Sequence, residues 1–337
     1  MSEVASSDRL RVGAIDCGTN SIRLLVADLP TTGVGDGGPP LVEVHREMRV
    51  VRLGEGVDAT GRLSPAAIDR TQRALTDYAG TLRQTGATRV RMAATSASRD
   101  ADNTADFVAM VRDVLGQDPE VITGTEEAAL SFTGAVGELD PATGPFLVVD
   151  IGGGSTELVT GERVAGAAGG LTTRLFGAIS IDLGCVRLTE RLLHSDPPTA
   201  SERGSAVRWV REQLSRGLDA IPLADGAGTV VRRFVPVAGT ATTVAAAALG
   251  LTTYDADRIH LSTVGFDRTR EVAEFFLGAT RADRAALGYM HPGRVDVIGG
   301  GALILAILAD LVAERTGLQA MTVSEHDILD GLALSLG

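Results

Sequence analysis

One stretch in the middle of the chain, residues 146–160, constrains the fold most. Four apolar residues run into Asp150, three glycines and two hydroxyl residues follow, and Glu157 leads into a second apolar run. This pattern predicts a strand, a tight turn and a second strand. Glycines let backbone N–H groups approach an anion, and carboxylates at two strand ends are ligands for a hard cation such as Mg²⁺. The stretch therefore predicts a metal–phosphate site, with a plain Gly-rich turn as the alternative.

Residues 11–28 repeat this pattern near the start of the chain. In both stretches, apolar runs flank a turn that begins with aspartate and contains glycine and serine. The identical positions are Asp16 and Asp150, Gly18 and Gly152, Ser21 and Ser155, and Leu24 and Leu158. The copies lie too far apart for a solenoid repeat, so they predict two related halves that open with the same hairpin. A chance likeness of turn residues is the alternative.

The other elements are predicted from apolar periodicity and from turn and capping residues. Residues 31–40 are rich in glycine and proline and are expected to form a loop. Strands are expected over residues 41–51, 89–94, 120–123 and 171–181, and helices over residues 65–84, 103–115, 201–218 and 327–336. Residues 234–248 and 294–305 each predict a strand that enters a helix through small residues.

Length and charge exclude several functions. The 337 residues are enough for two domains of ordinary size. A net charge of −12 argues against a nucleic-acid partner bound through a broad basic face. The chain has no lysine, which excludes the Walker-A loop and the protein-kinase and Schiff-base mechanisms. Arginine remains for binding phosphate, and its planar fork suits that task.

Cysteine and histidine usage predicts neither a disulfide framework nor a zinc site. Cys17 and Cys185 are the only cysteines, and no His/Cys cluster lies near them. Four histidines stand singly in the sequence and are expected as surface or core side chains: His194, His260, His291 and His326. The chain begins without a secretory pattern, and its longest apolar segment is short of a membrane span. We therefore expect a cytoplasmic protein with no membrane partner.

Three further segments carry candidate phosphate-binding or catalytic groups. Arg99 follows two serines in a small polar loop just past a predicted strand, where open α/β sheets bind ligands; an ordinary solvated arginine is the alternative. Glu126 and Glu127 lie in the first turn of a predicted helix. There they either complement the helix dipole, or one of them faces the cleft and orients a water. Residues 239–243 are typical of both an anion site and a Thr-capped helix.

Eight motifs carry a resemblance to a known family. They are residues 16–21 (DCGTNS), 52–56 (RLGEG), 94–101 (ATSASRDA), 124–128 (GTEEA), 150–157 (DIGGGSTE), 183–190 (LGCVRLTE), 239–243 (GTATT) and 294–298 (RVDVI). In this order they resemble the exopolyphosphatase/guanosine pentaphosphatase family, within the actin–sugar kinase–heat-shock ATPase superfamily. The resemblance implies an α/β fold of two ribonuclease H-like, actin-like domains with mixed sheets, flanking helices and an interdomain cleft. The domains are expected over residues 1–125 and 126–337, with the last helix packing back on the first.

The resemblance also implies an activity, the release of terminal orthophosphate from inorganic polyphosphate by in-line attack of water. Its cofactor would be Mg²⁺, with Mn²⁺ as the alternative. By position, Glu127 resembles the general base, and the metal-side carboxylates correspond to Asp16, Asp150 and Glu157. The phosphate contacts correspond to Asn20, Ser21, Arg99, Gly153, Gly154 and Ser155. These roles agree with phosphoryl transfer, in which the protein mainly positions groups and neutralises charge.

The C-terminal region departs from the family pattern. The family's Ser-Glu-x-Gly-Leu-Arg-Glu-Gly stands here as SEHDILDG over residues 324–331, without the arginine. Any role of that arginine is therefore open. The chain also ends at Gly337, without the helical extension of longer relatives, which weakens the expectation of high processivity on long polyphosphate chains.

Other functions stay open at this point. The substrate could instead be guanosine pentaphosphate or another nucleoside polyphosphate. An actin-like ATPase or sugar kinase is disfavoured, because the sequence offers no recognisable nucleotide pocket or acceptor aspartate. A non-catalytic sensor of polyphosphate or of an alarmone would belong to another class, and intact Glu127, Asp150 and Glu157 argue against it. A homodimer is a further expectation on partners.

Overall fold

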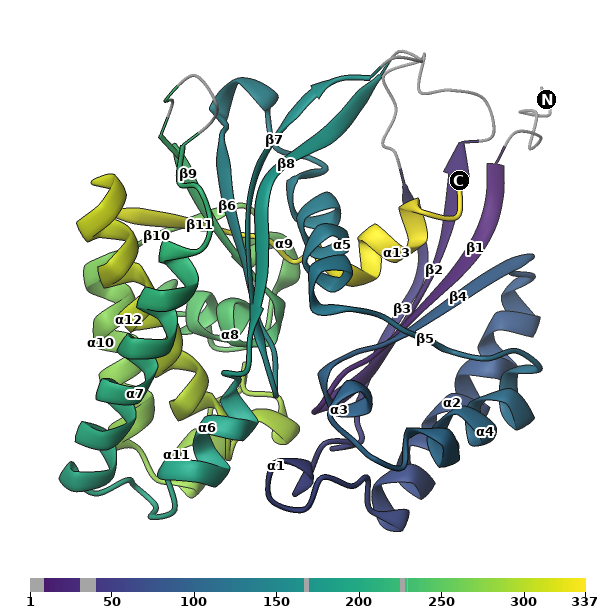
Figure 1. Cartoon of the computed structure of the whole chain (residues 1–337), viewed down its shortest axis with the longest axis horizontal. Helices are drawn as coiled ribbons and strands as arrows, with labels where there is room; N and C mark the ends of the chain where they lie inside the picture. The colour runs from purple at the N-terminus through teal and green to yellow at the C-terminus, as the bar shows by residue number, and fades with distance from the viewer. Residues whose placement is uncertain (1–8, 31–40, 167–169, 225–227, 229) are drawn as a thin grey trace.

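The structure is a computed structural model that describes the chain except for residues 1–8, 31–40, 167–169, 225–227 and 229. Two α/β halves lie side by side, each with a mixed sheet and flanking helices (Figure 1). This arrangement confirms the predicted fold class. The loop expected over residues 31–40 lies outside the described residues.

The first sheet is built on the predicted N-terminal hairpin. Its strands are β1 (Arg9–Cys17), β2 (Ser21–Pro30), β3 (Val42–Val50), β4 (Arg89–Ala94) and β5 (Glu120–Val121). They lie in the order β3-β2-β1-β4-β5, with β1 antiparallel to β2 and parallel to β4. Alternate residues of β1 enter different apolar clusters, because Val12 and Ala14 face one side of the sheet and Ile15 and Cys17 the other. A central strand buried on both faces therefore reads as one continuous apolar run.

Helices of the first half cover one face of this sheet and approach the cleft. They are α1 (Val57–Thr60), α2 (Pro65–Thr85), α3 (Ser96–Arg99) and α4 (Thr104–Leu115). The start of α2 follows the predicted signals, since the Ser64 side chain accepts from the Ala67 N–H and Pro65 lies in the first turn. The polar loop expected over residues 95–100 is wrong in form, because these residues make the helical turn α3. Its serines are buried against neighbouring elements rather than solvated.

The second sheet repeats the order of the first. Its strands are β6 (Phe146–Ile151), β7 (Thr156–Ala165), β8 (Leu171–Ile181), β9 (Arg233–Val237), β10 (Ser262–Gly265) and β11 (Ala320–Val323). The order is β10-β11-β9-β6-β7-β8. Strand β6 is antiparallel to β7 and parallel to β9, as β1 is to β2 and β4. The topology therefore confirms two related halves that each begin with the same hairpin.

Helices flank the second sheet and surround the buried helix α12. They are α6 (Cys185–Leu192), α7 (Ala200–Asp219), α8 (Ala238–Ala248), α9 (Ala256–Ile259), α10 (Phe266–Gly278), α11 (Arg281–Ala285) and α12 (Ile298–Thr316), with 3-10 turns at Pro141–Thr143 and Pro292–Arg294. The strand expected before α12 is wrong, because Arg294 ends a 3-10 turn and residues 295–297 form a turn. Strands β6 and β11 already occupy both edges of β9, and Pro292 with Gly293 favours a turn.

Two helices connect the halves near the cleft. Helix α13 (Ile328–Leu334) packs on the first sheet, and α5 (Gly124–Val136) packs on the second (Figure 1). They cross at glycines, since a Cβ added at Gly134 would lie 1.9 Å from the Asp327 carbonyl oxygen. The last helix thus lies against the first sheet as expected, while the domain boundary at residue 125 stays a prediction. Among the described helices, none is long and apolar enough to cross a membrane.

Candidate active site

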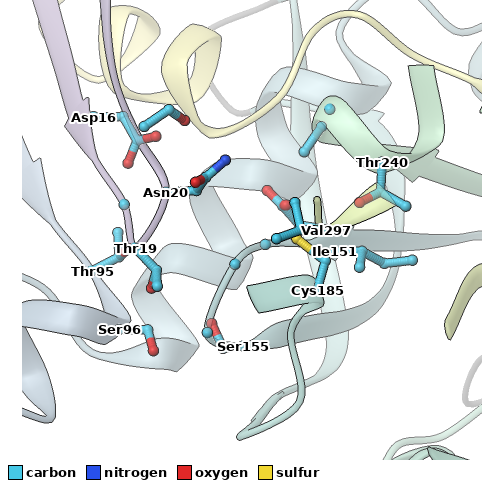
Figure 2. A pocket seen from close by; sticks show the side chains of 18 of the residues that line it. Asp16, Thr19, Asn20, Thr95, Ser96, Ile151, Ser155, Cys185, Thr240 and Val297 are labelled. Atoms are coloured by element: carbon cyan, nitrogen blue, oxygen red, sulfur yellow. The ribbon is translucent and has the colours of Figure 1, made fainter. Parts of the chain in front are cut away.

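The two hairpin turns meet at a cavity between the halves. Both turns close in the same way, because the Gly18 N–H donates to the Ser21 carbonyl oxygen and the Gly152 N–H to that of Ser155, each at 3.0 Å. Figure 2 shows Asp16, Thr19 and Asn20 on one side of this cavity and Ile151, Cys185 and Thr240 on the other. The repeated motif therefore forms two opposed walls of one site.

The second turn approaches the first half so closely that it requires glycine. A Cβ at Gly154 would lie 2.6 Å from the Ser96 Oγ and 2.7 Å from the Thr19 Oγ1. Real Cβ atoms essentially never come that close to another heavy atom. The glycines thus let the backbone of one half reach the polar side chains of the other, where a phosphate would bind.

The structure brings most of the predicted site residues to this cavity. Those that line it are Asp16, Asn20, Ser21, Glu127, Asp150, Gly153, Gly154 and Ser155. Arg99 and Glu157 do not line the cavity themselves. Arg99 contacts Glu127, Glu157 faces Asp150, and both of those partners line it. The individual roles assigned to all these side chains stay predictions.

Helix α5 places two side chains of the site on one face. Glu127 and Ser131 are one turn apart, so both point the same way. Glu127 Oε2 accepts a hydrogen bond of 2.7 Å from Arg99, whose guanidinium also donates to the Ile122 carbonyl oxygen at 3.1 Å. Burial raises the pKa of Glu127, while the Arg99 charge opposes that rise. Arg99 therefore fixes the orientation of a buried carboxylate whose pKa is shifted toward neutral pH.

Asp16 is held by an arginine that the sequence reasoning missed. Arg23 lies directly opposite Asp16 in the β1–β2 ladder and donates to its Oδ2 through Nε at 2.9 Å and Nη2 at 2.7 Å. Burial nevertheless leaves the pKa of Asp16 raised. Its other oxygen, Oδ1, is buried and has no hydrogen-bond partner within the described part of the chain. The contact of Arg23 with Asp16 could have been predicted from the strand register, because the hairpin turn determines which residues face each other.

Asp150 and Glu157 also face each other across a ladder. Asp150 Oδ2 accepts from Ser131 at 2.9 Å, and Glu157 Oε1 accepts from Ser180 at 2.7 Å. Burial, and after it the Asp327 charge, raises the pKa of Asp150 to about 7. Burial, and after it the Glu127 charge, raises the pKa of Glu157 well above its usual range. Neither carboxylate has an ion-pair partner among the described arginines and histidines.

These carboxylates fit a hard divalent cation. Buried charges are normally paired or bound to a metal, and the acids here outnumber the guanidinium groups in contact with them. The orphaned Oδ1 of Asp16 belongs to a residue that lines the cavity, as does Asp150. Carboxylate oxygens are the ligands that Mg²⁺ takes in proteins. Asp16 and Asp150 could hold such an ion, and the Glu157 carboxylate, which faces Asp150 across the ladder, would add negative charge beside it.

Arg294 is a further cation of the cavity. It lines the wall formed by the second half, and its Nη1 donates to Thr243 Oγ1 at 3.0 Å. Its guanidinium covers Gly239, since a Cβ there would lie 2.5 Å from it. It makes no ion pair with the carboxylates that the structure describes, so its charge is available to an anion in the cavity. In the sequence, Arg294 was marked only by its place in the motif of residues 294–298.

The prediction that the histidines stand singly is wrong for two of them. The rings of His260 and His326 lie 4.5 Å apart, and Glu138 contacts both. These side chains come from three distant segments, so their spacing in sequence carried no signal. His260 Nδ1 accepts the Glu325 N–H at 3.2 Å, so its proton lies on Nε2, where it donates to Glu138 at 3.1 Å. A metal at Nε2 would need the opposite tautomer, and this cluster is therefore a hydrogen-bonded contact.

The departing C-terminal motif contributes an acid instead of the family's arginine. Leu329 stands where the family has that arginine, and it is buried in the apolar cluster under the first sheet. Asp327, two residues earlier, forms an ion pair with Arg23. Burial raises the pKa of Asp327, but the Arg23 charge and the hydrogen bond from the Leu329 N–H together lower it by more. The pKa of Asp327 is therefore below its usual value.

A cleft between two related α/β halves, with Gly-rich hairpin turns and buried carboxylates on opposite walls, defines a phosphate-handling protein of the actin-like class. The chain belongs to the Ppx/GppA phosphatase family, which it matches over residues 33–336. It is 55% identical over 331 residues to a Mycobacterium tuberculosis protein named exopolyphosphatase 2, covering 97% of this chain and 98% of that protein.

Solved structures agree with this membership. One is an exopolyphosphatase-like protein with a TM-score of 0.87 and 39% sequence identity, aligned over 98% of both chains. Another is the Aquifex aeolicus member of the Ppx/GppA family, with a TM-score of 0.75 and 28% identity over 97% of both chains. The family resemblance inferred from the ordered motifs is therefore confirmed.

Proposed function

We propose that this protein is a Mg²⁺-dependent exopolyphosphatase that releases terminal orthophosphate from inorganic polyphosphate, with Glu127 as general base. One observation carries the proposal: the buried Glu127 carboxylate lines the cavity between the two hairpin turns, and Arg99 holds it in place. The name of the 55% identical relative supports the choice of substrate.

Glu127 has the properties that a general base needs. Its raised pKa brings it closer to neutral pH, where a carboxylate accepts a proton from water more effectively. Because Arg99 holds Oε2, the carboxylate has a fixed orientation, and it would receive the attacking water from the cavity that it lines. The water would then attack the terminal phosphorus in line with the leaving oxygen, and Glu127 would accept its proton.

The chain supplies the remaining contacts from both hairpin turns. Backbone N–H groups of Gly153 and Gly154 and the side chains of Asn20, Ser21 and Ser155 would bind the terminal phosphoryl group. Arg294 would add positive charge on the second wall. Asp16 and Asp150 would hold Mg²⁺, which, when bound, neutralises charge on the phosphoryl oxygens.

The test compares two adjacent glutamates. Glu127→Gln is expected to lower phosphate release from polyphosphate by roughly 10²- to 10⁴-fold, because the base is lost while the side-chain shape is kept. Glu126→Gln is the matched control, since Glu126 is exposed and paired with Arg91 at 2.9 Å. It should retain wild-type turnover. Wild-type turnover by Glu127→Gln would contradict the assignment of the base.

A substrate panel tests the reaction itself. In the presence of Mg²⁺, values of kcat/KM on polyphosphates of several lengths should exceed the value on guanosine pentaphosphate, and removal of Mg²⁺ should abolish turnover. A preference for the nucleotide would show that guanosine pentaphosphate, rather than polyphosphate, is the substrate. Tight polyphosphate binding without phosphate release in either Mg²⁺ or Mn²⁺ would indicate a sensor instead.

A further inference from the structure

We propose that Asp327 is a positioning residue for the metal site, acting through Arg23 on the Asp16 carboxylate. The inference rests on the proposed function, because it assigns a task to Asp16 in holding the metal ion. It goes beyond that function by giving the C-terminal segment, where this chain departs from its family's pattern, a defined part in the site.

Arg23 is shared between two carboxylates from distant parts of the chain. Its Nε and Nη2 donate to Asp16 on β1, and its Nη1 donates to Asp327 Oδ2 just before α13. The Arg23 side chain is only 19% exposed, and those of Asp16 and Asp327 are 7% and 3% exposed. Water therefore screens these three charges little, and each constrains the position of the next.

The way Arg23 binds Asp16 is unusual for such a pair. An arginine and a carboxylate commonly form two parallel hydrogen bonds that use both carboxylate oxygens. Here both donors converge on Oδ2, and Oδ1 of Asp16 is left buried without a hydrogen-bond partner in the described chain. Asp16 lines the cavity, and Oδ1, which Arg23 leaves without a partner, is the oxygen that would bind a cation there.

Asp327 explains why Arg23 does not take both oxygens. The ion pair at Nη1 anchors the far side of the guanidinium and so limits its rotation toward Asp16 Oδ1. Without that anchor, the fork could turn to bind both oxygens, and Arg23 would then compete directly with the metal ion. The negative charge of Asp327 also offsets part of the positive charge that Arg23 brings to a cation site.

Asp327 is itself held rigidly at the start of α13. Its Oδ1 accepts the Leu329 N–H at 3.0 Å, and its own N–H donates to Asp330 Oδ2 at 3.1 Å. Asp330 in turn accepts from Arg46 on β3 at 2.6 Å. Helix α5 also packs directly against the Asp327 backbone, since a Cβ at Gly134 would lie 1.9 Å from the Asp327 carbonyl oxygen. The docking of the last helix thereby determines where Arg23 lies.

Two isosteric variants separate positioning from simple packing. Asp327→Asn removes the charge that anchors Arg23 but keeps an oxygen for the Leu329 N–H. Asp330→Asn is the matched control, because it weakens the same helix cap and the Arg46 pair without touching Arg23. Melting temperatures show whether either variant is less stable than the wild type.

The readout is metal binding without substrate, followed as loss of the free Mn²⁺ signal in electron paramagnetic resonance. Asp327→Asn should weaken Mn²⁺ binding by roughly 10- to 100-fold, the usual effect of losing a group that orients a metal ligand. Asp330→Asn should bind Mn²⁺ as the wild type does. In phosphate release, the Asp327→Asn defect should diminish as Mg²⁺ is raised, with the KM for polyphosphate unchanged.

Three outcomes would overturn the inference. Equal Mn²⁺ affinity in Asp327→Asn and wild type, or equal weakening in both variants, would show that Asp327 does not act through Arg23. Wild-type protein that binds no Mn²⁺ would remove the metal site itself. Wild-type protein that binds Mn²⁺ but releases no phosphate would instead defeat the proposed function, and the two variants would still report on Asp327.

Discussion

The two hairpins that open the halves differ at one matched position. Each has an aspartate at the end of its first strand and a residue facing it from the second strand. In the first hairpin Arg23 faces Asp16, and in the second Glu157 faces Asp150. The turns close with the same hydrogen bond, so the backbone is nearly the same, while the facing residue carries the opposite charge.

Because of this difference, the two walls of the cavity differ in how far their negative charge is compensated. The first hairpin compensates most of its own negative charge, because Arg23 lies between Asp16 and Asp327. The second places two buried carboxylates face to face, and neither has an ion-pair partner among the described arginines and histidines. A cation would therefore stabilise the second wall most, and under the proposed function Asp16 on the first wall would supply an oriented ligand. A repeat can thus keep one backbone and still give its copies different chemistry.

The largest expected effect comes from exchanging the facing residues for the same neutral side chain. Arg23→Gln should lower the free energy of unfolding by about 3–5 kcal/mol, because it leaves two buried carboxylates without their cation. Glu157→Gln, at the matched position, should leave it unchanged or higher in metal-free protein, since it removes one of two facing acids. Urea unfolding in a chelator measures both. Equal destabilisation by the two variants would contradict the proposed difference between the two hairpins.

The next effect is a dependence of stability on pH that the second hairpin should cause. The pKa of Asp150 is raised in the folded protein to about 7 from 3.8. Its protonated form therefore stabilises the fold below about pH 4, and this contribution is lost as pH rises to about 7, at up to about 1.4 kcal/mol per pH unit. Urea unfolding of wild type and Asp150→Asn in a chelator isolates this contribution, because the histidines cancel in the difference.

In that comparison, wild type should lose stability relative to Asp150→Asn as pH rises from 5 to 7.5. Adding Mg²⁺ at pH 7.5 should stabilise wild type and leave the variant nearly unaffected, because the ion replaces the proton. A wild type that gains stability relative to the variant over this range would show that Asp150 is already ionised and compensated in the metal-free fold.

The smallest expected effect comes from the hydroxyl that supports Asp150. Ser131→Ala removes the 2.9 Å hydrogen bond to Asp150, which holds its pKa down. The acid limb of the pH profile of phosphate release should therefore move upward by about one pH unit. Thr133→Ala is the control on the same helix, since its hydroxyl donates to the Ala129 carbonyl oxygen within α5. A profile that does not move would place Asp150 outside the titration that limits turnover.

Local sequence was sufficient for the parts of this protein that depend on short-range rules. Apolar runs on either side of an acidic Gly-rich turn determined both hairpins, and their likeness determined the paired halves. Ser64 with Pro65 determined the start of α2. The first-turn acids of α5 and the motif order pointed to Glu127 and to the family. Each of these follows from neighbours in the chain, where propensity and capping decide.

Tertiary structure decided which charges meet. The register of β1 with β2 placed Arg23 on Asp16, and the crossing of α5 with α13 brought Asp327 to the same guanidinium. It also placed Arg99 on Glu127 and His260 beside His326, two contacts that the sequence did not signal. Residues 295–297 formed a turn because β9 had no free edge left for a strand. Burial then set the pKa of each carboxylate, because it depends on surroundings contributed by distant segments rather than on the residue itself.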